Sequence, residues 1–137
     1  MEFLVGSMSA IVVGTSATLC GLDRDRAFYP TITMFIASYY LLFAAMGGSV
    51  QAIVAESAIL FLFLAASILG FKSTLWLVVA ALVAHGIFDL AHAHLIANAG
   101  VPSWWPSACF TYDIVAAGYL ALLLRRALVP ARSAPDR

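Results

Sequence analysis

Charged residues are scarce in this sequence, and their scarcity excludes most soluble folds. Lys, Arg, Asp and Glu together make up 10% of the 137 residues, whereas an average soluble domain has roughly 25%. A soluble fold of this length needs far more polar surface, so lipid must surround most of the chain. The formal net charge is zero. This balance argues against a nucleic-acid partner and against a polybasic segment that binds a membrane surface.

The sequence consists mainly of long apolar runs. Hydrophobic residues account for 64% of the chain, and five runs approach the ~20 residues that a helix needs to cross a ~30 Å hydrocarbon core. We therefore predict an all-α integral membrane bundle of five transmembrane helices, with one domain over residues 1–128 and a disordered cytoplasmic tail at 129–137. The predicted spans are residues 3–20, 28–47, 50–70, 74–97 and 108–124.

The few basic residues predict the orientation of the bundle. With five spans, the connections alternate between the two sides of the membrane, and every Lys and Arg falls on one side. The positive-inside rule makes that side the cytoplasm. The N-terminus and the connection 98–107 then face outward, the C-terminus is cytoplasmic, and the inner (cytoplasmic) membrane of a cell is the predicted location. The basic residues are Arg24, Arg26, Lys72, Arg125, Arg126, Arg132 and Arg137.

Cysteine is also rare. Cys20 lies at the inner end of the first predicted span and Cys109 at the outer end of the fifth, about a bilayer thickness apart. A disulfide requires Cα atoms within ~7 Å. We therefore predict no intramolecular disulfide and a buried, inert Cys109.

The first predicted span is rich in small residues. Such residues let helices approach closely in a membrane, so we interpret them as a packing face. They are Gly6, Ser7, Ser9, Ala10, Gly14 and Ala17.

Six ionisable residues fall inside the predicted spans. A group of this kind is costly in lipid unless it is paired, which makes each a candidate functional residue. They are Glu56, His85, Asp89, His92, His94 and Asp113.

Three of these residues share one face of the fourth predicted span. At ~100° per residue, His85, Asp89 and His92 point within about 60° of one another. His94 points to nearly the opposite side, and we interpret it as an interface residue.

Residues of four spans are predicted to lie at one depth. A rise of ~1.5 Å per residue brings Asp89 to about the same level as Glu56 on the third span and Asp113 on the fifth. Tyr39 and Tyr40 of the second span lie at a comparable level. We therefore predict one polar layer in the outer half of the bilayer.

The acids in this layer have no basic partner. Lys and Arg are absent from it, so the carboxylates must be protonated, pair with imidazolium or bind a cation. Imidazole and carboxylate groups are the ligands of zinc, iron and manganese, and helix-borne acids and histidines hold the metals of di-iron bundles. We predict a divalent metal site. Five ligands suffice for two ions, but a site for one ion is the simpler interpretation. The candidate ligands are His85, Asp89, His92, Glu56 and Asp113.

The leading functional hypothesis is a metal-dependent hydrolase or oxidoreductase that acts on a lipid-phase small molecule. Zinc would activate water for attack on a lipid head group or an amide, and iron would oxidise a lipid or quinone. In this hypothesis Glu56 or Asp113 is a further ligand or the general base. Tyr39 or Tyr40 orients a substrate oxygen.

Two of the candidate ligands, Asp113 and Glu56, also have simpler interpretations that involve no metal. Asp113 is also compatible with a near-surface acid that the start of its helix favours. Glu56 is also compatible with a protonated acid that is hydrogen-bonded to Tyr39 or Tyr40.

The stretch from His85 to Asp113 resembles families of small bacterial polytopic membrane proteins. It contains His-x3-Asp-x2-His on a helix, then Pro102-Ser-Trp104-Trp105-Pro106, then a helix with Asp113. The resemblance covers about the last third of the chain and supplies no activity to carry over.

Two other classes of function remain open. In the first, the chain is a non-catalytic subunit of a larger membrane complex, in which a histidine ligates haem or a pigment; the clustered acids argue against such a ligand. The sequence is also compatible with a homo-oligomer. In the second, the acids and histidines carry protons or cations across the membrane. The apolar inner halves of the predicted spans argue against a continuous path.

Overall fold

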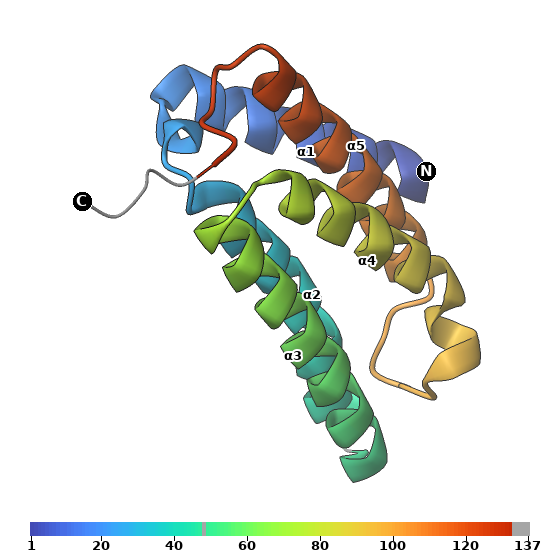
Figure 1. Cartoon of the computed structure of the whole chain (residues 1–137). Coiled ribbons are helices and arrows are strands. Elements are labelled where there is room, and N and C mark those ends of the chain that lie inside the picture. Colours follow the sequence, from blue (N-terminus) through green and yellow to red (C-terminus); the bar gives the residue numbers. More distant parts are fainter. Residues whose placement is uncertain (48, 133–137) are drawn as a thin grey trace.

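Five long helices make up the protein in a computed structural model that describes residues 1–47 and 49–132 (Figure 1). All five are long and apolar enough to cross a membrane, so the predicted all-α bundle with five candidate membrane spans is confirmed. The helices are α1 (Glu2–Cys20), α2 (Phe28–Gly47), α3 (Val50–Lys72), α4 (Trp76–Leu95) and α5 (Trp105–Arg125), and a short 3-10 helix, η1 (Leu22–Arg24), follows α1.

The ends of α4 and α5 differ from the predicted spans. α4 is shorter than the predicted span 74–97 at both ends, because it begins at Trp76 and ends at Leu95. α5 begins at Trp105, before the predicted start at residue 108. Pro106 lies in the first turn of α5, where its missing N–H costs no helical hydrogen bond. Residues 105–107, which were predicted to belong to the connection, are therefore part of α5.

The helices form two groups that diverge toward one end. α2 and α3 form an antiparallel hairpin, while α1 and α4 flank α5 in the second group, as Figure 1 shows. α4 joins the groups because it contacts both α3 and α5. The connection between α4 and α5 lies at the diverging end and returns to the hairpin at Gly100. A Cβ atom there would lie 1.9 Å from the carbonyl oxygen of Phe43, so only glycine allows this close approach.

α1 packs on α5 through small residues. Its buried residues are Gly6, Ala10, Gly14 and Ala17, at spacings of one helical turn. This finding agrees with the packing face that the sequence predicts.

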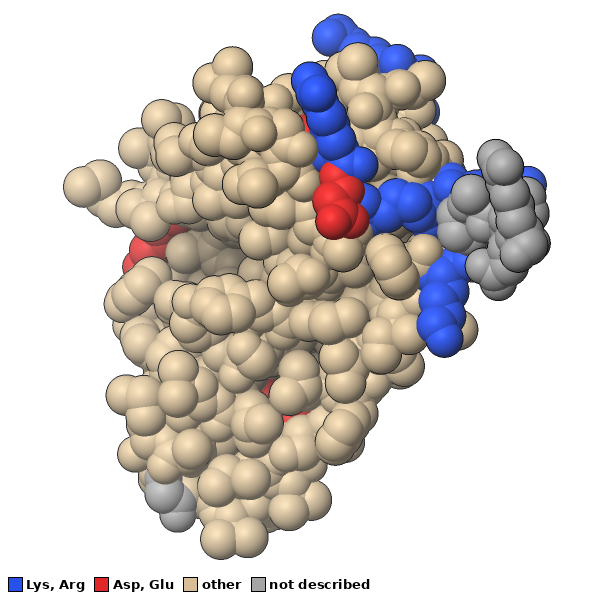
Figure 2. Space-filling view, turned by 90° about the vertical axis from the view of Figure 1, so that its left-hand side faces the viewer, with Lys and Arg blue, Asp and Glu red and all other residues tan. Residues whose placement is uncertain are grey.

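Lipid is the solvent that the surface of the bundle requires. Large apolar side chains are exposed on every helix, including Leu4 on α1, Phe35 on α2, Phe61 on α3, Leu90 on α4 and Leu122 on α5. Figure 2 shows one face of the molecule, on which basic side chains gather at the upper right, while the lower half is almost entirely tan apart from a small patch of acidic atoms. A soluble monomer rarely exposes so continuous an apolar surface.

Residues 129–132 correct the prediction of a disordered tail. Val129 is buried, Leu75 N–H donates to the carbonyl oxygen of Ala131 over 2.8 Å, and Thr74 forms an isolated bridge with Arg132. The Arg26 guanidinium also donates to the carbonyl oxygen of Pro130. This segment is held because it covers the start of α4, whose backbone N–H groups need acceptors. The remainder of the predicted tail, 133–137, lies outside the described residues.

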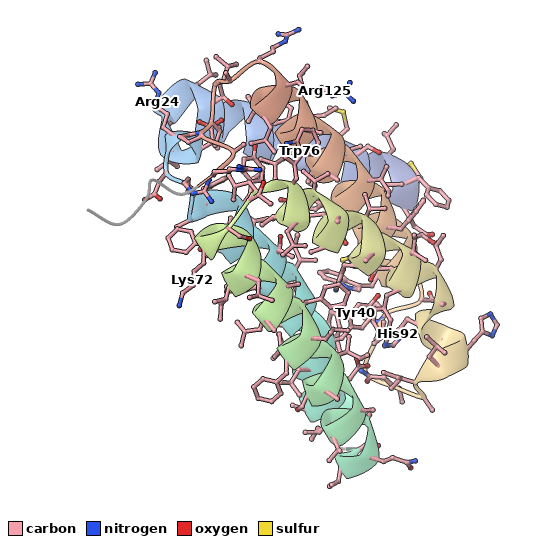
Figure 3. All side chains as sticks on the ribbon, in the orientation of Figure 1. Arg24, Tyr40, Lys72, Trp76, His92 and Arg125 are labelled. Carbon is pink, nitrogen blue, oxygen red and sulfur yellow. The ribbon has the colours of Figure 1, made fainter. Side chains whose placement is uncertain are left out.

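Basic residues gather at one end of the bundle, which we call the basic end. It comprises the connection from α1 to α2, the connection from α3 to α4, and the segment after α5. Arg24, Lys72 and Arg125 mark it in Figure 3, well away from Tyr40 and His92. The structure fixes this segregation, whereas the identity of the cytoplasmic side remains a prediction.

A pair of serine replacements tests the orientation. Ser73 lies in the α3–α4 turn at the basic end, and Ser103 lies in the opposite connection; both are exposed. In a background that lacks Cys20 and Cys109, we expect Ser103→Cys to react with a membrane-impermeant thiol reagent added to intact cells, and Ser73→Cys to react only after lysis. The opposite labelling pattern would invert the predicted orientation.

Candidate metal centre

Three buried side chains from α4 and α5 form a compact polar group, which we call the triad. His85 and Asp89 lie one turn apart on α4, and Asp113 faces them from α5. The imidazole Nδ1 of His85 lies 2.7 Å from Asp113 Oδ2 and 3.6 Å from Asp89 Oδ2. Each residue offers a ligand atom within 4.8 Å of the other two. None of the three is more than 1% exposed.

A second polar pair lies one helical turn further along α4. The Nε2 atom of His92 lies 2.7 Å from Glu56 Oε1 on α3. Asn98, just beyond α4, donates to the same carboxylate oxygen over 2.9 Å and to the backbone carbonyl of Tyr40 over 3.1 Å. The pair therefore ties α3, α4, α2 and the α4–α5 connection together.

Tyr40 of α2 connects the triad to this pair. Its hydroxyl donates to Asp89 Oδ1 over 2.8 Å. Its ring stacks on the ring of His92, with centroids 4.1 Å apart and planes 21° from parallel. Tyr40 and His92 lie side by side in the angle between the two helix groups (Figure 3).

Aromatic rings close the remaining sides of the cluster. Phe63 meets the His85 ring edge-on at 4.7 Å between centroids, and Phe88 meets the His92 ring edge-on at 5.5 Å. Both rings bring apolar surface against the imidazoles. Electrostatic interactions within the cluster are therefore screened much less than at a wet surface.

The charges of the two groups differ. Glu56 and His92 can neutralise each other as one carboxylate and one imidazolium. The triad has two carboxylates for one imidazole, and its ion pairs in the described part of the chain involve no Lys or Arg. Two carboxylates, a neutral imidazole and one divalent cation sum to zero, so the triad has the composition of a cation site.

Unpartnered atoms lie where a cation needs ligands. Asp89 Oδ2 and Asp113 Oδ1 are buried and lack a hydrogen-bond partner among the described residues, as does His85 Nε2. Buried polar atoms without partners are rare and costly in a folded protein. The two carboxylate oxygens are available for coordination, which fits zinc, iron or manganese.

The structure divides the predicted ligands into two groups. Residues of α2, α3, α4 and α5 do converge on one layer, as their predicted depths indicate. However, only His85, Asp89 and Asp113 form the group that could hold a metal, while His92 and Glu56 bind each other.

Burial and hydrogen bonding bear on three of the predicted details. Asp113 is fully buried, so it is not the near-surface acid of the simpler interpretation. The partners of Glu56 are His92 and Asn98, not Tyr39 or Tyr40. His94 is exposed, in agreement with its predicted position opposite the shared face.

Tyr39 does not join the polar cluster. Its ring contacts Phe35, Phe43 and Trp105, the last at 4.8 Å between centroids. Adjacent helical residues point ~100° apart, so Tyr40 faces α4 and Tyr39 faces a separate cavity. A catalytic role for Tyr39 at the triad therefore has no support from its contacts.

Asn98 is not among the predicted site residues. It lies in a predicted connection, and its side chain reaches back to the cluster because the chain turns just after α4. The only local signal was an amide side chain beside the helix end, which is common in connections.

Tyr40→Phe is expected to lower the free energy of unfolding by ~1–2 kcal/mol, because it removes the hydrogen bond to Asp89 and keeps the stacked ring. Tyr39→Phe is the matched control, with an expected change within about 0.5 kcal/mol. Denaturation by dodecyl sulfate in mixed micelles measures both. Equal effects of the two variants would contradict a role for the Tyr40–Asp89 bond.

Comparison of the chain with models of protein families, with curated proteins and with solved structures found no match in any of the three. The site itself must therefore carry the functional proposal.

Proposed function

We propose that this protein is a metal-dependent membrane enzyme that binds one divalent ion through His85, Asp89 and Asp113 and acts on a lipid-phase molecule. The observation that carries the proposal is the buried triad, in which three ligand atoms lie within 4.8 Å of one another and the acids have no Lys or Arg partner among the described residues. Ligands ~2.0–2.2 Å from a zinc ion lie about 3–3.6 Å apart. His85 Nδ1 lies 2.7 Å from Asp113 Oδ2 and 3.6 Å from Asp89 Oδ2, and one ligand atom of each residue lies within 4.8 Å of the others. The side chains would therefore have to adjust around a bound ion.

The ligand set leaves coordination positions for chemistry. One imidazole and two carboxylates fill three positions, as in catalytic sites that keep an open position for water or substrate. The bound ion would activate water for hydrolysis or exchange electrons with a substrate, depending on the metal. Zinc favours the hydrolase and iron or manganese the oxidoreductase.

The remaining polar residues have supporting roles in this proposal. Tyr40 holds Asp89 in place through its hydroxyl, as a positioning residue. Glu56 and His92 are the candidate acid–base pair, because His92 also borders a hollow of about 550 Å³ at the end opposite the basic end. Asn98 lines the same hollow and holds the Glu56 carboxylate.

Metal content by elemental mass spectrometry tests the proposal. We expect about one equivalent of zinc, iron or manganese in the detergent-purified protein, and a loss of at least about tenfold in Asp89→Asn and in Asp113→Asn, which remove ligand charge at constant shape. Glu56→Gln is the control and should keep the metal. The proposal fails if the parent stays metal-free after incubation with each ion, or if the two asparagine variants bind as much metal as the parent.

A further inference from the structure

A separate cavity of about 400 Å³ lies between α1, α2 and α5. Its volume is within the ~300–1,000 Å³ typical of small-molecule sites. Val5, Ser9, Phe35 and Trp104 on its rim are exposed, whereas Ile36 on its floor is buried. Because the exposed surface of these helices faces lipid, the cavity opens sideways into the bilayer.

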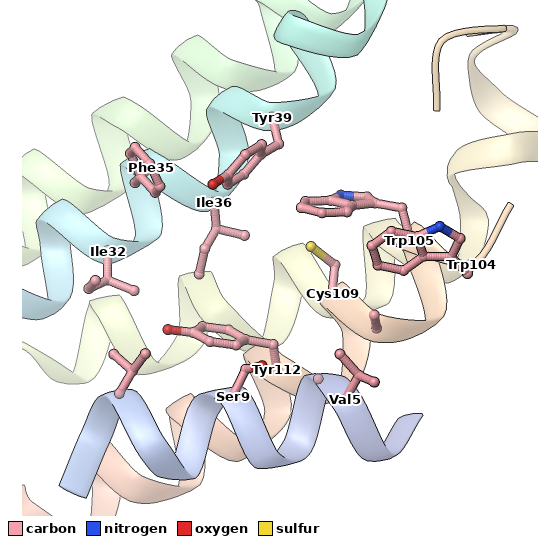
Figure 4. A pocket seen from close by; sticks show the side chains of 13 residues that line it. Val5, Ser9, Ile32, Phe35, Ile36, Tyr39, Trp104, Trp105, Cys109 and Tyr112 are labelled. Carbon is pink, nitrogen blue, oxygen red and sulfur yellow. The ribbon is translucent and has the colours of Figure 1, made fainter. Parts of the chain in front are cut away.

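Aromatic rings form much of the cavity wall. Tyr39 and Phe35 come from α2, and Tyr112 and Trp105 from α5, with Trp104 just before it (Figure 4). Flat aromatic surfaces on facing helices favour a flat ring between them. The described residues that line the cavity include no charged side chain, and a charged ligand would lose its hydration without compensation.

Two tyrosine hydroxyls in the cavity lack hydrogen-bond partners among the described residues. The hydroxyls of Tyr39 and Tyr112 point into the space between α1 and α2 in Figure 4. Neither makes a hydrogen bond with the described residues, whereas the Tyr40 hydroxyl nearby is bonded to Asp89. Lipid tails offer no acceptor, so both donors are left for a ligand with oxygen acceptors.

We infer that this cavity binds a lipid-soluble quinone: an uncharged, flat ring with carbonyl oxygens and an apolar tail. Tyr39 and Tyr112 donate to the carbonyl oxygens, the aromatic rings hold the quinone ring, and the tail leaves through the lateral opening. None of the triad residues lines the cavity, so binding does not require the metal. Cys109, which lines the cavity, lies one turn from Asp113 on α5. Use of the quinone as a substrate of the metal centre rests on the proposed function.

Tryptophan fluorescence provides the test. Trp104 and Trp105 line the cavity and Trp76 lies at the basic end. A bound quinone should therefore quench the emission of Trp104 and Trp105. We expect saturable quenching when a decyl-substituted benzoquinone is titrated into the protein in nanodiscs. Tyr39→Phe and Tyr112→Phe should each weaken binding about fivefold to tenfold, the equivalent of one lost hydrogen bond.

Two serine variants on α1 provide the steric control. Ser9→Phe places a ring at the cavity mouth and should abolish saturable quenching, while Ser16→Phe, exposed on α1 away from the cavity, should not. Circular dichroism checks that both variants fold. Non-saturable quenching, or equal binding by both serine variants, would overturn the inference.

Two further measurements distinguish the alternatives. If excess decane restores the quenched emission, and Tyr39→Phe and Tyr112→Phe bind the quinone as the parent does, the cavity is only an acyl-chain groove and the inference is wrong. The Asp113→Asn variant should bind the quinone as the parent does. Failure of the metal test with intact quinone binding would overturn the enzyme proposal alone.

Discussion

Glu56→Ala is expected to destabilise the bundle by ~3–5 kcal/mol, because it removes one partner of the buried Glu56–His92 pair and leaves the other without it. The Glu56 carboxylate is 1% exposed and accepts from His92 and Asn98 through one oxygen. Its removal would also release the α4–α5 connection from α3, since Asn98 loses the partner that holds it there. The measurement is unfolding by dodecyl sulfate in mixed micelles.

The replacement Glu56→Gln separates charge from hydrogen bonding. Glutamine retains an oxygen acceptor for Asn98 but no charge for the imidazole, so we expect a smaller loss of about 1–2 kcal/mol. The double replacement of Glu56 and His92 by leucine should cost less than the sum of the single changes, because no unpaired charge remains. Additive losses would show that the two residues are not coupled.

Gly6→Val is expected to destabilise the packing of α1 on α5 by ~1–3 kcal/mol or more. A Cβ atom at Gly6 would lie 2.0 Å from the carbonyl oxygen of Ala108 and 2.3 Å from the hydroxyl oxygen of Thr111. The first of these neighbours is backbone and cannot rotate away. α1 must therefore move off α5, which also opens the cavity that α1 helps to line.

Gly118→Ala is the matched control for this prediction. Gly118 lies within α5, and a Cβ atom there meets nothing within 4 Å. Alanine should be neutral or stabilise the helix by up to ~1 kcal/mol. The same denaturation assay measures both variants. If Gly6→Val were as stable as Gly118→Ala, this result would contradict the close packing of α1 on α5 at Gly6.

The divergence of the two helix groups explains why a small chain holds both a buried polar site and a separate cavity. Where α4 bridges the groups, its polar face is enclosed by α2, α3 and α5, and this enclosure forms the triad and the Glu56–His92 pair. On the other side of α5, α1 and α2 stay apart and leave the lateral cavity. One deep polar site and one lipid-facing cavity therefore lie within a single bundle.

The sequence by itself determined the helices and the members of the polar layer. Each apolar run encodes its own span, because a helix satisfies its backbone hydrogen bonds internally in lipid. Helix periodicity placed His85, Asp89 and His92 on one face, and the rise per residue brought Asp113 and Glu56 to the level of the α4 residues that they contact. These properties are local, so no knowledge of helix neighbours was needed.

Only the tertiary structure decided which of these residues pair. Depth and face do not specify helix order or rotation, so the match of His85 with Asp113 and of His92 with Glu56 could not be derived. The same holds for Tyr40, which turns toward Asp89 while Tyr39 turns away. The physical reason is that helix neighbours are selected by packing between spans, as when small residues of α1 admit the backbone of α5, and this information is spread over the whole chain.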